Sequence, residues 1–213
     1  MLGHGSLLDF GWLRTNEAGT QLLTCLQQRD GGRLRQYGLL EHPHIPSHMH
    51  LEEVTYKVMV VGKAGVGKTS TVARLTGSEV PLTHNETPGL QTSTVYWPGR
   101  IQHLGKNVLF NIQLFDAGDA ALKRYDHILP ACKDRVDAIL FLFSFDLHAH
   151  SEVTQRDIRD LESNWQVPVL QIRNLHSAHQ SETIAGAIND ISPVLNTLCE
   201  HLWHRDVVMS GKG

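Results

Sequence analysis

An α/β fold around a parallel sheet is the fold class that this sequence predicts, and three observations support it. The Val-rich run 56–61 is a short apolar strand, and a glycine-rich turn leads from it into a helix over 67–75. The uninterrupted apolar run 137–145 is typical of a strand buried on both faces of a parallel sheet. Polar and apolar residues alternate over 92–97 and 108–115, which predicts two more strands.

Further elements complete the predicted domain. Residues 98–106 include Gly99 and Gly105, and they can join the two alternating strands as an antiparallel hairpin. Helices on both faces would cover the sheet. We expect these helices over 120–132, 151–165 and 181–203, with a break or kink at Pro193, and a further strand over 168–172.

The first fifty residues differ from the rest in pattern. Thr15 or Asn16 can cap a short helix that runs to about Gln28. Residues 42–50 hold four histidines and two prolines, which predicts an exposed loop. We therefore divide the chain into an N-terminal extension with a short helix and linker over 1–54, a domain over 55–205 and a C-terminal tail over 206–213.

The composition is that of one ordinary folded domain with a short appendage. Of the 213 residues, 41% are hydrophobic and 19% are charged, which is enough apolar content for a sizeable core. The 19 Lys and Arg against 22 Asp and Glu give a formal charge of −3, which argues against nucleic-acid binding. The three cysteines are widely spaced and predict no disulfide framework, so we expect a reducing, cytoplasmic compartment.

We expect no direct anchorage in a membrane. The longest apolar run, 138–143, is far shorter than the roughly 20 residues that a spanning helix needs. The sequence shows no secretory signal pattern, no prenylation cysteine and no myristoylation start. Any membrane contact is therefore expected to be indirect, through a partner protein.

The strongest functional motif is GKAGVGKT over 62–69, which matches the phosphate-binding loop pattern G-x-x-x-x-G-K-[ST]. Glycines let the backbone curl until several N–H groups point at an anion, and the following helix adds its positive N-terminal end. Lys68 can reach the β- and γ-phosphate oxygens, and Thr69 can ligate Mg²⁺. The nucleotide-binding residues predicted in this loop are Gly62, Lys63, Ala64, Gly65, Val66, Gly67, Lys68, Thr69 and Ser70.

Two later features extend this site. Thr87 lies in a polar loop and can complete the Mg²⁺ shell and sense the γ-phosphate, with Thr92 as a second candidate. Asp116 follows the apolar strand 108–115 and can hold Mg²⁺ through water, while Gly118 can present its N–H to the γ-phosphate. The predicted metal site therefore consists of Thr69, Thr87 and Asp116.

These features follow one another in the order of a Ras-superfamily small GTPase. The segments GKAGVGKTSTVARLTG, SEVPLTHNETPGLQTSTVYWP and FDAGDAALKRYDHILPACKDRVDAILFLFSF most resemble the Rem- and Rab-like group of the ciliogenesis and planar polarity effector complex. The resemblance covers most of the chain. It implies binding of GTP or GDP with Mg²⁺, a role in cilium assembly and in membrane and protein transport at the basal body and cytoskeleton, and partners such as Fuzzy and Inturned.

The residues after the magnesium aspartate depart from the small-GTPase pattern. The usual Asp-x-x-Gly-Gln is here Asp116-Ala117-Gly118-Asp119, one residue shorter and with an acid in place of the glutamine. The glutamine orients the attacking water, and a short anionic side chain beside the phosphates is a poor substitute. Ala64 also stands where hydrolytically active members often have glycine. We therefore expect at most a slow GTPase.

The spacing to the base-binding motif predicts a shortened domain. The usual [NT]-K-x-D is represented by Phe143-Ser144-Phe145-Asp146, which leaves Asp146 as the candidate guanine-reading residue. The family fold places helix, strand, helix and strand between the two aspartates, which needs on the order of 55 residues. Only 30 positions separate Asp116 from Asp146, so we expect a small-GTPase-like domain that lacks one helix and one strand.

Three functional interpretations remain open at this point. The first is a GTP-dependent switch whose loops become ordered around Mg²⁺ and nucleotide. The second is a non-hydrolysing interaction module that holds nucleotide for stability, which the shortened Asp-x-Gly and the altered base motif favour. The third is a P-loop ATPase or kinase, which would need an arginine-rich lid that the sequence does not show.

Overall fold

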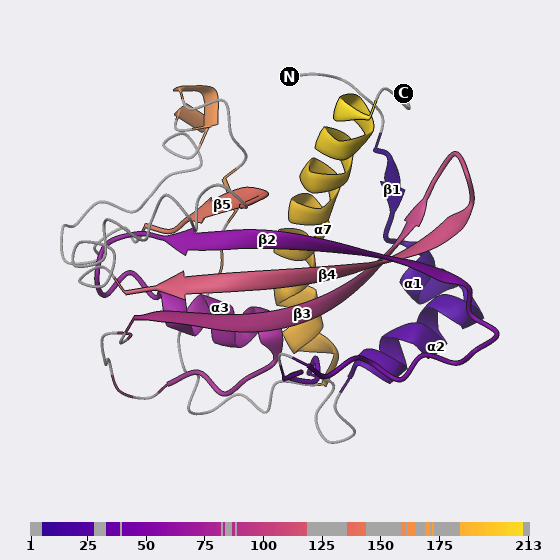
Figure 1. The fold of residues 1–213 in the computed structure, drawn as a ribbon, viewed down its shortest axis with the longest axis horizontal. Coiled ribbons are helices and arrows are strands. Elements are labelled where there is room, and N and C mark those ends of the chain that lie inside the picture. Colours follow the sequence, from indigo (N-terminus) through magenta and orange to yellow (C-terminus); the bar gives the residue numbers. More distant parts are fainter. Residues whose placement is uncertain are drawn as a thin grey trace.

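A computed structural model describes residues 6–27, 33–38, 40–81, 83, 87, 89–118, 136–143, 159–160, 162–164, 169–170, 172 and 184–210. The strands in this part of the chain form one five-stranded sheet in the order β1-β3-β4-β2-β5 (Figure 1). They are β1 (Leu8–Asp9), β2 (Leu51–Val61), β3 (Leu90–Ile101), β4 (Lys106–Ala117) and β5 (Ala138–Phe141). The helices are α1 (Trp12–Thr15), α2 (Glu17–Leu26), α3 (Lys68–Thr76) and α7 (Ile184–Met209).

The sheet is mixed rather than parallel throughout. β2 pairs in parallel with β4 on one side and with β5 on the other. β3 runs antiparallel to β4, and β1 runs antiparallel to β3. The α/β class and the antiparallel hairpin are therefore confirmed, and the parallel part of the sheet is confined to β4, β2 and β5.

The hairpin between β3 and β4 is longer than the sequence predicts. β3 continues to Ile101 and β4 begins at Lys106, so the connecting turn is four residues long and ends at Gly105, whose φ of 62° suits glycine. Pro98, predicted to lie in the loop, is inside β3. A strand tolerates proline where the missing N–H faces an edge that is not continuously paired. In the described part of the chain, the outer edge of β3 has only two short pairings.

One face of the sheet carries the main hydrophobic core. Alternate residues of β4, from Val108 to Leu114, are fully buried there together with Val58 and Val60 of β2. α3 and α7 cover this face (Figure 1). The α7 residues that enter the core repeat every three or four positions, as expected for one face of a helix: they are Ile188, Ile191, Val194, Leu195, Cys199 and Leu202.

α7 passes through Pro193 as one helix of 26 residues, so the break predicted there does not occur. Proline removes one intrahelical hydrogen bond. Ile191, Val194 and Leu195 on either side of it are almost completely buried, and this packing holds the helix together across the missing bond. The helix also continues to Met209, six residues beyond the predicted end.

β5 is not buried on both faces, contrary to the prediction for 137–145. It pairs only with β2 in the described part of the chain, and it spans four residues. Its side chains alternate: Ala138 and Leu140 pack on the core, whereas Ile139 and Phe141 are 64% and 60% exposed. An uninterrupted apolar run can therefore form a strand that is covered on one face only.

The N-terminal helix has the predicted start. Asn16 caps α2, and its side-chain oxygen accepts a hydrogen bond from the N–H of Ala18 at 2.9 Å. Residues 42–50 form no helix or strand, as predicted, and all four of their histidines are exposed. Ile45 and Met49 in this loop pack against a small second cluster whose buried members are Trp12, Leu13 and Leu22.

Several predicted elements lie wholly or partly outside the described residues. The helix over 120–132 lies outside them. Of the helix over 151–165, residues 159–160 and 162–164 are described and are helical. Val169, Leu170 and Ile172 of the predicted strand 168–172 are described but are not in a strand, because none of them pairs with a described neighbour. No helix in the described ranges is both long enough and apolar enough to cross a bilayer.

Candidate functional site

Residues 62–67 connect β2 to α3 and form the predicted phosphate-binding loop. β2 lies between β4 and β5, and these three strands are parallel, so their carboxyl ends lie at the same edge of the sheet. The two strands parallel to β2, namely β4 and β5, lie on opposite sides of it. In open α/β sheets, ligands bind outside the strand ends at such a switch point.

Three glycines shape this loop for distinct reasons. A Cβ on Gly62 would lie 2.3 Å from the carbonyl oxygen of Leu142, so the chain after β5 leaves no room for a side chain. Gly65 and Gly67 have φ of 80° and 90°, which other residues adopt only with strain. Gly67 is the N-cap of α3, so the loop leads directly into the positive end of that helix.

Lys68 is the first residue of α3 and is buried against the loop. Only 7% of it is exposed, and its Nζ donates hydrogen bonds to the carbonyl oxygens of Gly62 and Lys63, each at 2.9 Å. An ammonium group has three donors, so two loop carbonyls leave capacity for an anion. Lys63 and Ala64 are exposed at the tip of the loop, and Val66 and Ser70 are half-buried.

The structure brings together the three residues predicted to bind metal. The Thr69 hydroxyl donates to Asp116 Oδ2 at 2.6 Å and lies 2.9 Å from the Thr87 hydroxyl. Thr87 Oγ1 is 3.4 Å from the same Asp116 oxygen. These side chains come from the start of α3, the segment before β3 and the end of β4. Three oxygen-bearing groups that are distant in sequence thus meet beside the loop.

The buried carboxylate of Asp116 indicates which kind of ion this cluster can bind. Asp116 is 2% exposed, and its Oδ1 atom has no hydrogen-bond partner in the described part of the structure. Leaving a buried acceptor unpaired is costly, the more so for a charged group. A hard cation with a preference for oxygen ligands removes that cost, and Mg²⁺ is such a cation. The hydroxyl and carboxylate donor set therefore fits magnesium.

A hydrogen bond of Gly118 connects the segment after β4 to the segment before β3. The Gly118 N–H donates to the carbonyl oxygen of Gly89 at 3.2 Å, directly beyond the last β3–β4 pair. Thr92, the second candidate for the metal site, lies inside β3 opposite Phe115, so Thr87 is the threonine that reaches the cluster. Asp119 and the predicted guanine-reading residue Asp146 lie outside the described residues.

A second polar cluster, in which Asn111 and Tyr96 are buried and Glu53 is exposed, was not predicted. Asn111 lies within β4, where its Nδ2 donates to Glu53 Oε1 at 2.9 Å and to the Tyr96 hydroxyl at 3.4 Å. Burial of the phenol, with a smaller effect of the Glu53 charge, raises the pKa of Tyr96 to about 12. The one sequence signal was a polar Asn within the otherwise apolar stretch 108–112. The cluster lies on the opposite face of the sheet from the main core.

One pocket in the described structure is remote from the phosphate loop. It measures about 260 Å³ and lies among α1, α2, β3 and α7. Its polar groups bond within the protein: the Trp97 indole donates to Asn196 Oδ1 at 2.8 Å, and the Ser192 hydroxyl donates to the Ile188 carbonyl at 2.5 Å. These polar groups are therefore satisfied within the protein, unlike Asp116 Oδ1, which has no partner in the described part of the structure.

Comparison with known proteins identifies relatives that align with this chain over almost the whole of both sequences. The chain is similar to ciliogenesis and planar polarity effector 2 of Xenopus laevis, with 37% identity over 96% of both chains. It is similar to the human protein of that name, with 34% identity over 97% of this chain and 93% of the relative. The X. laevis alignment spans 241 positions and this chain has 213 residues, so at least 28 positions are gaps in this chain. Such gaps agree with the predicted shortening.

The chain also has a weaker, partial similarity to a Ras-related protein. The chain is 28% identical to the dog Ras-related protein Rab-25 over 61% of its own length and 58% of that relative. No family model matches the sequence. The identities of 33–37% over at least 95% of this chain are decisive. The chain therefore belongs to the family of the ciliogenesis and planar polarity effector 2 proteins.

Proposed function

We propose that this chain is a GTP-binding, small-GTPase-like switch that acts in cilium assembly. Membership of the ciliogenesis and planar polarity effector 2 family supports the cellular role, because the relatives share most of their length with this chain. The partial similarity to Rab-25 supports the biochemical one. We place its action at the basal body and cytoskeleton, in targeted membrane and protein transport.

One observation carries the nucleotide-binding proposal. Thr69, Thr87 and Asp116 lie within hydrogen-bond distance of one another beside the loop that holds Lys68, and Asp116 Oδ1 is buried without a described partner. A magnesium ion and a phosphate group would each find their ligands in this arrangement. Neither a structural turn nor a simple helix start explains a buried carboxylate between two threonines.

Each residue has a distinct part in this proposal. Lys68 and the N–H groups of residues 62–69 bind phosphate oxygens and orient the nucleotide. Thr69 and Thr87 would hold Mg²⁺ with their hydroxyls and Asp116 with its carboxylate; the ion neutralises phosphate charge when bound. Gly118 N–H lies close enough to Gly89 for the two loops to respond together. We propose Asp146 as the residue that selects guanine.

Family membership supports a proposal about the partners. We propose that the chain assembles with other subunits of the ciliogenesis and planar polarity effector complex, such as Fuzzy and Inturned. Hydrolysis is expected to be slow or absent, because Asp119 stands in the position of the water-orienting glutamine. The binding event, rather than turnover, would then carry the signal.

A non-hydrolysing interaction module is the second candidate function. Two observations favour it: at least 28 positions of the X. laevis alignment are gaps in this chain, and only 30 positions separate Asp116 from Asp146. In that case nucleotide stabilises the fold, and partner binding is the same with GDP and GTP. A P-loop ATPase or kinase is the third candidate, and ATP competition tests it.

The decisive experiment is a titration of fluorescent GTP, GDP and ATP with Mg²⁺. We expect GTP and GDP to compete better than ATP. Lys68→Ala should weaken all three by roughly 10- to 100-fold, because it removes a charge-assisted hydrogen bond to phosphate. Lys106→Ala is the matched control, because Lys106 lies at the end of β4 that is remote from the phosphate loop. This variant should bind nucleotide as the parent does. Unchanged binding by Lys68→Ala would refute the proposed site.

Two further measurements separate the candidate functions. Capture of the partner subunits by GDP-loaded and GTP-loaded protein tests the switch, and equal capture supports the interaction module. Equal affinity for ATP and GTP would show that Asp146 does not select guanine.

A further inference from the structure

β5 is a short strand whose apolar pattern does not determine its register. It pairs with β2 over four residues, Ala138–Phe141, at one edge of the described sheet (Figure 1). Every residue from 138 to 143 is apolar. A slip along β2 by one or two residues would still place apolar side chains against the core, so hydrophobic patterning specifies the register only weakly. The register of β5 therefore depends on polar contacts outside this run.

The residue directly before β5 makes such a contact with β2. The Asp137 N–H donates to the Lys57 carbonyl oxygen at 2.8 Å, and Asp137 Oδ2 accepts the Lys57 N–H at 2.7 Å. No other residue from 137 to 143 has a side-chain acceptor. A slipped strand would place an apolar residue opposite Lys57, so this pair of hydrogen bonds exists only in the observed register.

Arg205 of α7 holds Asp137 from outside the sheet. Its guanidinium donates to the Asp137 carbonyl oxygen and, at 3.0 Å, to Asp137 Oδ1. Two of its nitrogens also donate to Asp206 Oδ1, at 2.9 and 3.1 Å. Isolated ion pairs near the surface contribute little, but a planar guanidinium shared by several acceptors fixes the positions of all of them. Arg205 therefore restrains the start of β5.

A second contact joins the same part of α7 to β2. The Tyr56 hydroxyl donates to Asp206 Oδ2 at 2.7 Å, and the Arg205 guanidinium carbon lies 5.9 Å from the centre of the Tyr56 ring. Burial of Tyr56, together with its hydrogen bond to Asp206, raises the pKa of the phenol well above its usual range. Tyr56 therefore remains a donor at neutral pH. It holds this end of α7 on β2, and Arg205 holds Asp137 in place beside it.

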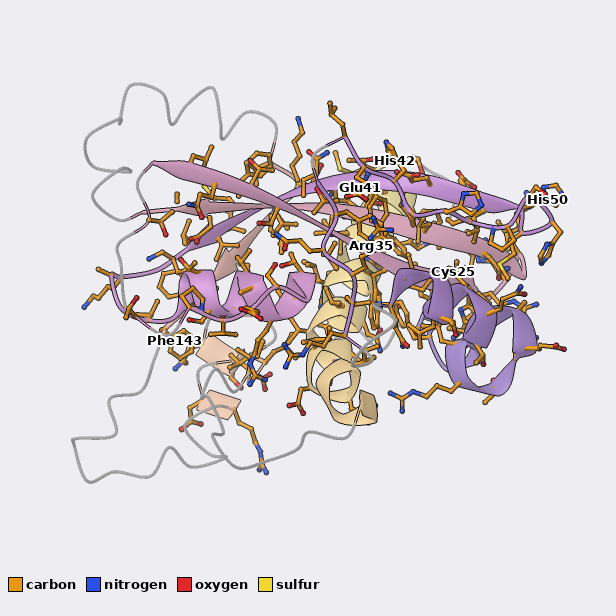
Figure 2. The ribbon with its side chains drawn as sticks, turned by 90° about the horizontal axis from the view of Figure 1, so that it is seen from below. Cys25, Arg35, Glu41, His42, His50 and Phe143 are labelled. Carbon is orange, nitrogen blue, oxygen red and sulfur yellow. The ribbon has the colours of Figure 1, made fainter. Side chains whose placement is uncertain are left out.

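The far end of β5 contacts the phosphate loop. The Leu142 N–H donates to the Val61 carbonyl oxygen at 2.8 Å, and the fit of the Leu142 carbonyl against Gly62 leaves no room for a Cβ. The Gly62 carbonyl oxygen in turn accepts a hydrogen bond from Lys68. Figure 2 shows Phe143, the next residue, at the same end of the sheet as the start of α3. A slip of two residues would move Leu142 by roughly 7 Å and remove its contact with the loop.

We propose that Arg205 is a positioning residue for the phosphate loop, because it fixes the register of β5 and thereby the place of Leu142 against Gly62. Arg205 acts through β5 and touches neither phosphate nor metal. Its expected effect on affinity rests on the proposed nucleotide binding, whereas its effect on β5 does not require a bound ligand. The C-terminal end of α7 thus takes part in shaping a site that lies at the other end of β5.

Amide hydrogen exchange of the full chain without nucleotide tests the effect on β5. We expect Arg205→Ala to accelerate exchange at Lys57, Asp137 and Leu142 by at least about tenfold, with the β3–β4 ladder unchanged, since local opening costs less than global unfolding. Faster exchange at Asp137 with parental exchange at Leu142 would show that the effect ends at the start of β5, and this would overturn the proposal.

Glu200→Ala is the matched control on the same helix. Glu200 accepts hydrogen bonds from the N–H groups of Leu7 and Leu8, at 2.6 and 3.2 Å, so its loss affects the N-terminal segment rather than β5. We expect parental exchange at Leu142 and parental nucleotide affinity in this variant. Equal acceleration at Leu142 would show that any weakening of α7 has this effect, and would contradict a specific role for Arg205.

Nucleotide titration tests the effect on the site. We expect Arg205→Ala to weaken GTP and GDP binding by roughly 3- to 10-fold. The factor should be the same with Mg²⁺ and with a chelator, because the loop moves and the metal cluster does not. Parental affinity in this variant would refute the positioning role and leave the proposed function intact. If the parent itself binds no nucleotide, the proposed function fails, and exchange at Leu142 alone decides the role of Arg205.

Arg205→Lys keeps the test decisive if Arg205→Ala does not fold. Lysine keeps the charge but lacks the planar fork, so one ammonium group cannot hold both oxygens of Asp137 and the Asp206 carboxylate in the same geometry. We expect exchange at Leu142 to be accelerated by about threefold or more. A folded Arg205→Lys protein with parental exchange at Leu142 would equally overturn the proposal.

Discussion

The two ends of the sheet are built in opposite ways. At the carboxyl ends of β2, β4 and β5, one contiguous stretch of sequence, residues 62–70, supplies most of the site, whereas Thr87, Asp116 and Gly118 come from other segments. At the other end and along the β3 edge, the contacts join residues that are far apart, such as Glu200 with Leu7. A local motif can be read from a sequence, whereas a surface assembled from distant segments cannot, because its pairing depends on the complete fold.

The largest expected effect is the loss of stability caused by a glycine substitution where α3 meets the N-terminal segment. Gly77 ends α3 with φ of 75°, and a Cβ there would lie 1.8 Å from the Leu34 carbonyl oxygen. We expect Gly77→Ala to destabilise the protein by about 3 kcal/mol or more, since both the backbone and the contact with the N-terminal segment must shift. Chemical denaturation followed by fluorescence measures this loss.

Gly65→Ala is the matched control from the phosphate loop. Gly65 also has a positive φ, but no atom lies within 4 Å of the added Cβ. We expect a loss of only about 1–2 kcal/mol, from backbone strain alone. Equal losses for the two variants would show that the contact between Leu34 and Gly77 contributes nothing to stability.

Asp116→Asn tests the phosphate-loop end of the comparison. The amide keeps the size of the side chain but removes the charge that would hold Mg²⁺, so we expect nucleotide affinity with Mg²⁺ to fall by roughly 10- to 100-fold. Affinity measured in the presence of a chelator should change little. Thr92→Ala serves as the control, because Thr92 lies in β3 outside the cluster. A loss that is the same with and without Mg²⁺ would show that Asp116 acts only on the fold.

An effect that is confined to high pH concerns the buried Tyr96 phenol. Its pKa in the folded state, about 12, lies above the ordinary value of 10.0, mainly because of burial. The folded state therefore keeps its proton longer than the unfolded state, and stability falls as the pH rises from about 10 to about 12. The loss is on the order of 1–3 kcal/mol. Tyr96→Phe should remove this part of the pH dependence in urea titrations, and identical pH profiles for parent and variant would contradict it.

The sequence predicted the local backbone structure around residues 62–69 well. The strand before residue 62, the helix after residue 67 and the hairpin that leads to Asp116 all exist, because short-range periodicity and glycine placement fix them. The approach of Thr87 to Thr69 was an expectation from motif order, and the structure brings the two hydroxyls to 2.9 Å. Their role as metal ligands remains a proposal.

Other features could not be predicted from local patterns. The apolar run 137–145 was interpreted as a strand covered on both faces, yet hydrophobicity alone does not say how many faces are covered, and Ile139 and Phe141 are exposed. β1 is two residues long and has no periodicity to detect. The contacts of Asn111 could not be predicted, because a polar residue in a strand gives no information about its partners on neighbouring strands.

By itself, the sequence determined the local chemistry: a glycine loop, a lysine and a threonine at a helix start, and an aspartate at a strand end. These depend on backbone conformations and side-chain types within a few residues of one another. The tertiary structure alone decided which face of β5 is covered, that Thr87 rather than Thr92 reaches Asp116, and that the first residues of the chain cover the edge of β3. Those outcomes depend on contacts between segments up to 194 positions apart, where burial and hydrogen bonding across the whole fold select the partners.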